Sequence, residues 1–359
     1  MKEDTPNRRQ NSFDQLRLIA AFFVIITHSY ALLGLPETDV LYLVTRGATS
    51  FSTFGLWIFF VISGYLVTAS ALRSTSLWRY IQKRMLRIVP AFFVVILFAV
   101  GIIGSLFTTV SFLEYIKDPV TWNYLKGLTF FRLQYNLPGV FLSNPYPGAI
   151  NGSLWTIPYE IALYSIPAFV LMLRGAWRRV IRYVFSILWA FGIFSVLKWS
   201  TFLWGHTIPV LQLNMYHAVN FGLFFLAGSL LYVYKDVISL KSVPFLLCLI
   251  VWIVSFFTPY RVIANYIVVP YIILFVATSQ LFVFKSIQRI PDISYGLYLY
   301  AFPVQQSLAA LYGTRLSVSV FALLSLCATI PFAWLSWKYI EEPFLRRRNI
   351  HMKYQIIRI

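Results

Sequence analysis

The sequence predicts an all-α, polytopic membrane protein with about ten transmembrane helices. Of its 359 residues, 59% are hydrophobic and 19% aromatic, whereas 12% are charged, about half the charged share of a soluble domain. The apolar residues form runs long enough to cross a bilayer, and the basic residues stand in short clusters between these runs. So little polar material cannot cover a water-exposed surface.

The apolar runs define the expected helices, because a transmembrane helix needs roughly 20 mainly apolar residues. They lie near residues 13–33, 50–72, 88–108, 154–173, 180–199, 215–234, 243–259, 263–284, 293–312 and 317–338. The seventh and eighth runs are separated by so few residues that they are expected to form a tight hairpin or a re-entrant pair. The first lacks a small-residue cleavage site, so we expect a retained helix rather than a signal peptide.

The basic residues set the orientation, because cytoplasmic loops are enriched in Lys and Arg. If the N-terminus is cytoplasmic, most of the 30 Lys and Arg residues lie on the cytoplasmic side of the membrane. The exceptions are Arg46, Lys117, Lys126, Arg132, Lys198, Arg261 and Arg315. The sequence therefore predicts cytoplasmic N- and C-termini and a single membrane-embedded domain over 1–359. The expected cytoplasmic tails cover about 1–12 and 345–359, and a long extracytoplasmic loop, with room for a membrane-dipping lid, covers about 109–153.

The net charge of +18 also occurs in nucleic-acid-binding proteins. Here the basic clusters follow the ends of apolar runs, so we expect no nucleic-acid partner. Cys248 and Cys327 lie inside apolar runs and predict neither a disulfide nor a metal site. His206, His217 and His351 are expected at interfaces or in the tail, as ordinary solvated histidines.

Arg17 and His28 lie on one face of the first helix. Their separation returns to within about 20° of the same line and rises about 16 Å, while Asp14 lies about 40° off that line. An ionisable residue within a spanning helix indicates function by default. The alternatives are an interfacial topology anchor for Arg17 and a buried, hydrogen-bonded core histidine for His28.

Glu160 is the second intramembrane ionisable group. It is expected about 9 Å from the outer end of its helix, and His28 about 8 Å from the outer end of the first helix. A carboxylate at this depth would orient the imidazole and stabilise its protonated form. Equal depth favours a pair but does not establish contact.

The loop after the second run carries the basic residues Arg79, Lys83, Arg84 and Arg87. The segment from Lys83 to Arg87 spans one helical turn and would present a phosphate-binding face. A stop-transfer cluster attracted to anionic lipid is the alternative. In the second run, Ser63 and Gly64 would allow close helix approach.

Four stretches occur in a fixed order along the chain: Asp14-Gln15-Leu16-Arg17 with His28; Phe59 to Tyr65 followed by Arg84-Met85-Leu86-Arg87; Gly152-Ser153-Leu154-Trp155-Thr156 with Glu160 and Tyr164; and Ser294 to Leu299 with Tyr339 to Phe344. Together they resemble the acyltransferase-3 family of bacterial membrane O-acyltransferases. One departure is Ala301, where many members carry a histidine, so no second catalytic histidine is expected there.

The resemblance implies transfer of an acyl group, usually acetyl from cytoplasmic acetyl-CoA, to a sugar hydroxyl of lipopolysaccharide O-antigen, exopolysaccharide or peptidoglycan. His28 matches the family's essential histidine and Arg17 its paired basic residue. Arg84 and Arg87 match its basic pair, and Glu160 the acid after the tryptophan. Further residues of the matching stretches are candidates for supporting roles: Asp14, Ser63, Trp155, Tyr164, Tyr295 and Glu341.

A mechanism follows from these placements. Arg17 and the cluster of Lys83, Arg84 and Arg87 would hold the phosphates of acyl-CoA, and the pantetheine arm would thread outward between helices. His28, oriented by Glu160, would then act as general base on the acceptor hydroxyl or take the acyl group itself and relay it. The acyl group is acetyl or a larger one.

The expected partners are the lipid bilayer, acyl-CoA as a co-substrate and a lipid-linked glycan acceptor, in a bacterial cytoplasmic (inner) membrane. No bound cofactor or metal is expected, and no oligomeric state follows from the sequence. The alternative function is a transporter or exporter of lipid-linked glycan or another polar lipid, because intramembrane charges suit that class too. Against it, the sequence contains no inverted repeat. A non-catalytic assembly subunit has nothing positive to support it.

Overall fold

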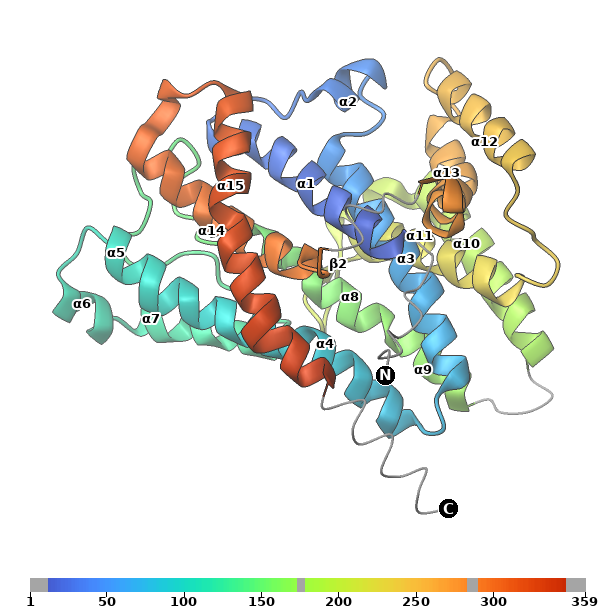
Figure 1. Cartoon of the computed structure of the whole chain (residues 1–359), viewed down its shortest axis with the longest axis horizontal. Helices are drawn as coiled ribbons and strands as arrows, with labels where there is room; N and C mark the ends of the chain where they lie inside the picture. The colour runs from blue at the N-terminus through green and yellow to red at the C-terminus, as the bar shows by residue number, and fades with distance from the viewer. Residues whose placement is uncertain (1–11, 173–177, 283–289, 347–359) are drawn as a thin grey trace, which may run out of the picture.

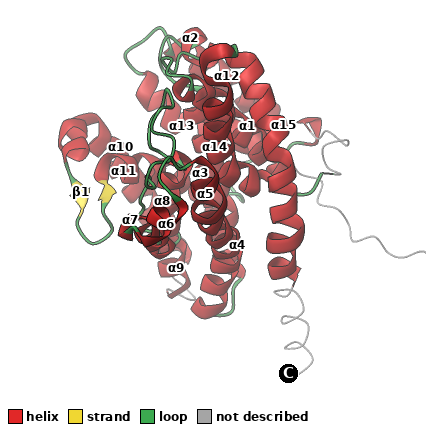
Figure 2. Cartoon of the chain, turned by 90° about the vertical axis from the view of Figure 1, so that its left-hand side faces the viewer, coloured by secondary structure: helices red, strands yellow, loops and turns green. Residues whose placement is uncertain are grey.

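The structure, a computed structural model of the chain, describes residues 12–172, 178–282 and 290–346. Within these ranges the ordered elements are helices, apart from one short antiparallel strand pair at the edge of the helical body (Figure 1 and Figure 2). The predicted all-α class is confirmed. The predictions that fall outside these ranges concern most of the tails at 1–12 and 345–359, and Arg174, Lys285 and His351.

The elements follow in chain order, with 3₁₀ and π segments labelled η. The first half contains α1 (Phe13–Leu32), α2 (Val40–Val44), α3 (Phe51–Arg73), α4 (Leu77–Phe98), η1 (Ala99–Gly104), α5 (Ser105–Phe107), α6 (Phe112–Lys117), α7 (Pro119–Asn123), η2 (Tyr124–Thr129), η3 (Gly152–Thr156), α8 (Ile157–Leu163) and α9 (Ser165–Met172). The second half contains α10 (Arg178–Gly205), β1 (Thr207–Ile208), β2 (Leu213–Asn214), α11 (Met215–Val233), α12 (Ser242–Ser255), α13 (Arg261–Thr278), η4 (Gln280–Phe282), α14 (Ser294–Tyr312), η6 (Gly313–Arg315), α15 (Val318–Ser336) and η7 (Trp337–Glu341).

Seven of the described helical stretches are long and apolar enough to cross a membrane: Phe13–Leu32, Phe51–Arg73, Leu77–Phe107, Val180–Gly205, Met215–Val233, Arg261–Thr278 and Val318–Arg346. The chain is therefore a polytopic integral membrane protein. Each of these stretches coincides with a predicted run. The other three runs became α8 with α9, α12 and α14; α12 is apolar but shorter, and α14 carries polar residues such as Gln305 and Gln306.

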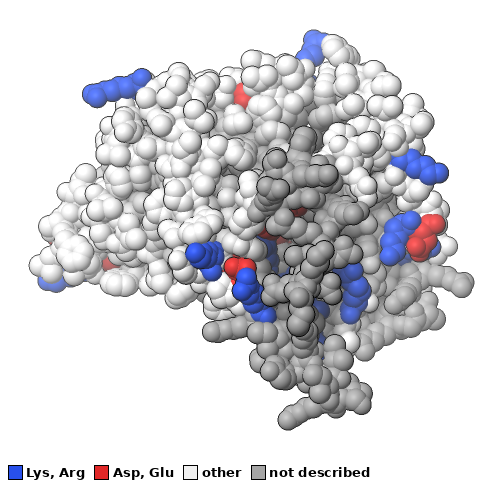
Figure 3. Space-filling view, viewed as in Figure 1, with Lys and Arg blue, Asp and Glu red and all other residues white. Residues whose placement is uncertain are grey.

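Charged side chains are few on the surface of the helical body. Figure 3 shows one face of the molecule, on which uncharged side chains dominate. Many large apolar side chains are exposed, among them Phe194 on α10 and Leu247 on α12. An exposed apolar surface of this extent is what a lipid-facing surface requires.

The third apolar run begins earlier than predicted. The expectation was a helix over 88–108 preceded by a basic loop, but α4 starts at Leu77, where the Ser76 side chain accepts a hydrogen bond from the Arg79 backbone N–H. This cap satisfies a free backbone donor of the first turn. The basic cluster therefore lies on a helix rather than in a loop, and its side chains have fixed directions.

The predicted straight helix over 154–173 is broken. Gly152–Thr156 forms a 3₁₀ segment, and the α-helix that follows is interrupted at Tyr164. Pro167 explains the interruption, because its ring clashes with the carbonyl four residues earlier and it has no N–H to donate. The 3₁₀ segment precedes Glu160 and changes the rise from the outer end of this stretch to that residue, because a 3₁₀ helix rises about 2.0 Å per residue.

The long connection at 109–153 is ordered. It forms α6, α7 and η2, and a capping box between Ser111 and Glu114 starts α6. The Ser111 hydrogen bonds lower the pKa of Glu114, because they favour its charged form. Tyr115 and Tyr124 are fully buried, and the Tyr115 hydroxyl donates to the Val100 carbonyl at 2.8 Å. These contacts attach the loop to the end of α4.

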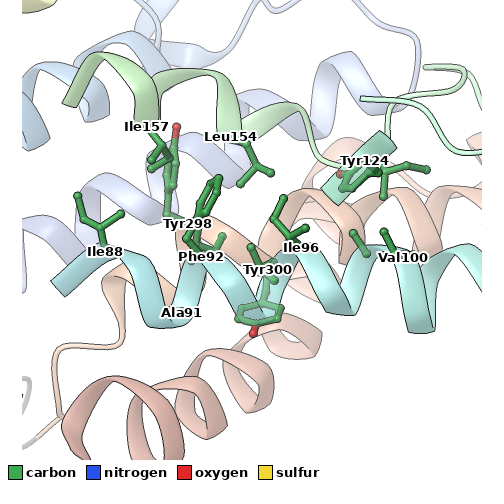
Figure 4. Close-up of a cluster of buried hydrophobic side chains, with 14 of the residues drawn as sticks. Ile88, Ala91, Phe92, Ile96, Val100, Tyr124, Leu154, Ile157, Tyr298 and Tyr300 are labelled. Atoms are coloured by element: carbon green, nitrogen blue, oxygen red, sulfur yellow. The ribbon is translucent and has the colours of Figure 1, made fainter. Parts of the chain in front are cut away.

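α4 supplies one wall of the largest apolar cluster. Its residues Ile88, Phe92 and Ile96 lie along one side of the helix and face Tyr298 of α14 and Leu154 of η3 (Figure 4). Apolar residues spaced by three or four positions share a helix face. The cluster thus joins α4 to the segments that carry the third and fourth family-like stretches.

α1 lies between α3 on one side and α14 and α15 on the other (Figure 1). α3 in turn packs closely on α11. A Cβ atom added at Gly64 of α3 would lie 1.9 Å from the Phe225 carbonyl oxygen, and one added at Gly228 of α11 would lie 2.1 Å from the Val61 carbonyl oxygen. The predicted role of Gly64 in close helix approach is confirmed.

Replacing Gly64 with alanine is expected to destabilise the protein by about 1–3 kcal/mol, because the two backbones must separate to admit the methyl group. Thermal unfolding of the detergent-solubilised variant measures this. Gly101→Ala is the matched control, since a Cβ at Gly101 meets no atom within 4 Å. Equal melting temperatures for the two variants would contradict the close approach.

Candidate functional site

Two cavities in the helical body share two of their lining residues. The first, here the arginine cavity, has an empty volume of about 800 Å³ and is lined by Arg17, Leu56, Phe59, Phe60, Ser63, Leu66, Val67, Arg84, Arg87, Ile88, Thr156, Ile157, Glu160, Tyr164, Ser294, Tyr295 and Tyr298. The second, the histidine cavity, measures about 750 Å³ and is lined by Val24, His28, Glu37, Ser52, Thr53, Leu56, Trp155, His217, Asn220, Phe221 and Tyr298. Leu56 and Tyr298 line both, so they form the partition between them.

Arg17 and Arg87 meet at a shared carboxylate. Arg87 Nη2 donates to Asp292 Oδ2 at 2.6 Å, and Arg17 Nη1 lies 3.5 Å from the same oxygen and 2.9 Å from Asp14 Oδ1. Arg87 Nη1 also lies 3.9 Å from Glu341 Oε2. The acidic partners hold both guanidinium groups at the edge of the arginine cavity.

Asp292 was missed by sequence reasoning. It lies just before α14 and its side chain is 10% exposed. Burial alone would raise the pKa of Asp292, but Arg87 and Arg17 hold that pKa below its ordinary value. An acid just before a helix is a visible helix-start signal. Its arginine partners, however, are distant in sequence and only the fold reveals them.

Arg84 lies one turn before Arg87 on α4 and also lines the arginine cavity. Its guanidinium lies over the Tyr164 ring, 5.9 Å from the centroid, and its Nε is buried without a hydrogen-bond partner among the described residues. Lys83 is not among the residues that line this cavity. The structure thus brings Arg17, Arg84 and Arg87 together and leaves Lys83 outside the group.

Glu160 lies in the arginine cavity, not beside His28. The Tyr164 hydroxyl donates to its Oε1 at 2.6 Å, and the Ser63 hydroxyl reaches the same oxygen at 3.5 Å. Glu160 is absent from the lining of the histidine cavity. The equal depth was counted along a regular α-helix from its outer end, but residues 152–156 form a 3₁₀ segment, which rises about 2.0 Å per residue instead of about 1.5 Å.

The other supporting candidates divide between the cavities. Ser63, Tyr164 and Tyr295 line the arginine cavity, and the Tyr295 hydroxyl donates to the Ile88 carbonyl at 3.1 Å. Trp155 lines the histidine cavity. Asp14 forms an ion pair with Arg17, and Glu341 lies near Arg87; neither acid lines either cavity.

His28 faces the histidine cavity from α1. Its Nδ1 is buried and has no hydrogen-bond partner within the described ranges, and its ring meets Phe302 edge-on at 5.5 Å. The edge of the imidazole ring opposite Nδ1 therefore faces the cavity. His28 and Arg17 lie on the same helix, and each lines a different cavity.

A buried carboxylate holds the helix ends around His28. Asp39 caps α2, and its Oδ2 accepts from the Thr27 hydroxyl at 2.6 Å and from the Phe51 backbone N–H at 2.9 Å. These bonds tie α1 to the start of α3. Near it, burial and the negative charge of Asp39 raise the pKa of Glu37, which opens into the cavity.

His217 is not the solvated histidine that was expected. It lies in the first turn of α11, half-buried, on the wall of the cavity that His28 also lines. Its ring is stacked on Phe221 and lies 4.7 Å from Trp155 and 4.8 Å from Trp204, centroid to centroid. No sequence pattern indicates this placement, because the two histidines belong to helices that are distant in the chain.

No group of three His, Cys, Asp or Glu side chains in the described part of the chain is arranged to hold a metal ion. One cavity contains cations and a hydrogen-bonded carboxylate, and the other contains two histidines with aromatic and hydroxyl groups. Leu56 and Tyr298 line both cavities. The Tyr298 hydroxyl donates to the Ser153 carbonyl at 2.8 Å, which holds this side chain in place.

Comparison with known proteins adds independent information. Residues 10–338 match the model of a family described as acyltransferase domain. An O-acetyl transferase of Shigella phage Sf6 is 28% identical over 354 residues, covering 95% of this chain and 98% of the relative. Nodulation protein 10 of Rhizobium leguminosarum bv. viciae is also 28% identical, covering 95% of this chain and 94% of the relative.

A third relative is a longer protein. The peptidoglycan O-acetyltransferase OatA of Listeria monocytogenes serovar 1/2a is 26% identical over 334 residues, covering 84% of this chain and 52% of the relative. No solved structure matches the chain. All three similarities extend over most of the chain.

Proposed function

The chain belongs to the acyltransferase family whose model matches residues 10–338, and on that premise we propose that it is a membrane O-acetyltransferase. It would transfer the acyl group of a cytoplasmic acyl-CoA to a sugar hydroxyl of a lipid-linked or surface polysaccharide. The observation that carries this proposal is the pair of cavities, one with three arginines and one with His28, that meet at Leu56 and Tyr298.

The arginine cavity is the proposed donor site. Guanidinium groups bind phosphate through paired, charge-assisted hydrogen bonds, and acyl-CoA carries several phosphates. Arg17 and Arg87 are held in place by Asp292, so less side-chain freedom is lost on binding. The apolar wall, which includes Phe59 and Ile157, suits the pantetheine arm and leads toward the partition.

At the partition the thioester would meet the exposed edge of His28. As general base, His28 removes the proton of the acceptor hydroxyl while that oxygen bonds to the acyl carbon. The carbon–sulfur bond then breaks, and the imidazolium returns the proton to the CoA thiolate. In the relay route, a ring nitrogen of His28 attacks the acyl carbon, the carbon–sulfur bond breaks, and the departing CoA thiolate takes up the ring proton. The acceptor oxygen then bonds to the acyl carbon, the carbon–nitrogen bond breaks, and the hydroxyl proton passes to the released imidazole.

A single turnover without acceptor separates the two routes. The purified protein in lipid nanodiscs would be mixed with radiolabelled acetyl-CoA, quenched, and digested. Label retained on the peptide that contains His28 supports the relay, and released CoA must match it mole for mole. Absence of protein-bound label, with full transfer once acceptor is added, supports direct attack.

The finer topology is part of the proposal. Ten spans with cytoplasmic N- and C-termini, in the bacterial inner membrane, would place the arginine cavity at the cytoplasmic surface, where acyl-CoA is made. The long connection at 109–153 would be extracytoplasmic, and residues 1–359 would form one domain. The relatives from Shigella phage Sf6 and Listeria support O-acetylation, and the latter supports a polysaccharide acceptor.

Deleting the gene in its host tests the function directly. The expected result is that surface glycan reaches the surface in normal amount and loses its O-acetyl groups, measured by proton NMR before and after mild alkali. Loss of the glycan from the surface would favour the alternative, an exporter of lipid-linked glycan. Normal O-acetylation in the deletion strain would contradict the proposal.

A further inference from the structure

Resting on the proposed function, we propose that the wall of the histidine cavity opposite His28 is the binding site for the sugar ring of the acceptor, and that His217 and Asn220 of α11 position it. Both residues line this cavity, one helical turn apart on the same helix face. His28 reaches the cavity from α1. A ring held by α11 would thus lie between its binding residues and the proposed base.

The charges of the cavity identify the class of ligand. Among the described residues no lysine or arginine lines it, and its ionisable lining groups are Glu37, His28, His217 and the phenol of Tyr298. A phosphate placed there would have no fixed cation to balance it. The cavity therefore suits an uncharged, hydroxyl-rich group, in contrast to the neighbouring cavity with its three arginines.

The lining also matches the two kinds of surface on a sugar ring. Trp155 and Phe221 present aromatic surface, on which the apolar C–H face of a sugar ring packs. Ser52, Thr53 and Asn220 present donors and acceptors for ring hydroxyls. A few placed polar groups among aromatic side chains is the usual composition of a specific small-molecule site.

Asn220 is oriented for this role. Its Oδ1 accepts a hydrogen bond from the Tyr266 hydroxyl at 2.8 Å. The amide nitrogen, which has two protons, is then left as the donor available to a ligand. Tyr266 thereby fixes which end of the amide faces the cavity.

The His217 ring is fixed by aromatic neighbours, but its nitrogens form no hydrogen bond within the described part of the protein. Its ring stacks on Phe221 at 5.8 Å and is enclosed by Trp155 and Trp204. Its ring nitrogens form no hydrogen bond with any described residue, and they are not sealed off from the cavity. A half-buried imidazole fixed by aromatic neighbours and left with free nitrogens is positioned to bond a ligand hydroxyl.

Acceptor and donor saturation curves test the proposal. The protein in nanodiscs would receive radiolabelled acetyl-CoA and, as acceptor, the glycan–lipid extract of the host membrane. For His217→Phe and Asn220→Leu we expect the acceptor concentration at half-maximal rate to rise at least tenfold, while the half-saturating acetyl-CoA concentration stays within twofold of the unmodified protein. His217→Gln, which keeps a hydrogen-bonding group, should recover most of the acceptor affinity.

The controls separate the possible failures. His217→Phe preserves the aromatic packing, so a purely structural histidine would leave both half-saturation values unchanged, and that result overturns the proposal. A rise in the half-saturating acetyl-CoA concentration, with that of the acceptor unchanged, would also overturn the proposal. His206→Ala replaces an exposed histidine near the start of the same helix and should change neither value. If the unmodified protein transfers no acetyl group to the extract, the proposed function itself fails.

Discussion

Replacing His28 with alanine is expected to reduce acyl transfer at least ~100-fold, the usual effect of removing a general base, and further if the histidine carries the acyl group. The protein should remain folded. Because His28 Nδ1 has no hydrogen-bond partner among the described residues, the substitution leaves no buried protein group unpaired. The loss should therefore appear in the rate of transfer and not in the amount of protein in the membrane.

O-acetyl content of the surface glycan, normalised to the amount of the acyltransferase in the membrane, measures this effect in cells. His28→Gln is the closer test, because glutamine keeps hydrogen-bonding groups but cannot act as base or nucleophile at neutral pH. His206→Ala serves as control, since that side chain is exposed and lies outside both cavities. Near-normal O-acetylation with His28→Gln would show that His28 is neither the general base nor the nucleophile.

Replacing Arg87 with alanine is expected to have two large effects. It removes a phosphate-binding guanidinium, so acyl-CoA affinity should fall at least tenfold. It also leaves Asp292 with a single cation, Arg17 at 3.5 Å, and leaves Glu341 without its nearby positive charge. Breaking a buried ion pair costs about 3–5 kcal/mol, so the melting temperature should drop as well.

The two effects can be separated by a second substitution. In Arg87→Gln with Asp292→Asn, both members of the Arg87–Asp292 pair lose their charge, so the part of the stability loss that comes from the unpaired Asp292 should return, while Glu341 still lacks its Arg87 partner. The acyl-CoA affinity, measured by calorimetry in nanodiscs, should not return. Arg79→Ala is the matched control, because Arg79 lies on the same helix, α4, but lines neither cavity. Recovery of affinity in the double variant would mean that Arg87 acts only through the stability of the fold.

Sequence alone was sufficient for the class of protein and for the stripe on the first helix. Apolar runs of spanning length have one stable outcome in a bilayer, because helices satisfy their own backbone hydrogen bonds. The helical period then places Arg17 and His28 on one face whatever surrounds them. The Gly64 packing site was predictable for a similar local reason, since a small residue permits close approach wherever another helix crosses.

Sequence reasoning failed where a segment is not a regular α-helix over the expected range. The depth of Glu160 was counted along a regular α-helix, but residues 152–156 form a 3₁₀ segment with a longer rise per residue. Glu160 contacts Tyr164 and Ser63 instead of His28. The length of α4 was underestimated because its first turns are basic and carry no apolar run. The Ser76 cap was the signal that could have located its start.

Tertiary structure decided which residues share a cavity. Asp292 joins Arg17 to Arg87, and His217 comes to face the cavity of His28, only because helices distant in the chain pack side by side. Local patterns report the chemistry and periodicity of a segment, whereas its partners depend on how all the segments pack. The sequence by itself therefore determined a membrane protein with a cation and an imidazole on one helix. The packing separated these two groups into adjoining cavities and supplied the carboxylate and the second histidine.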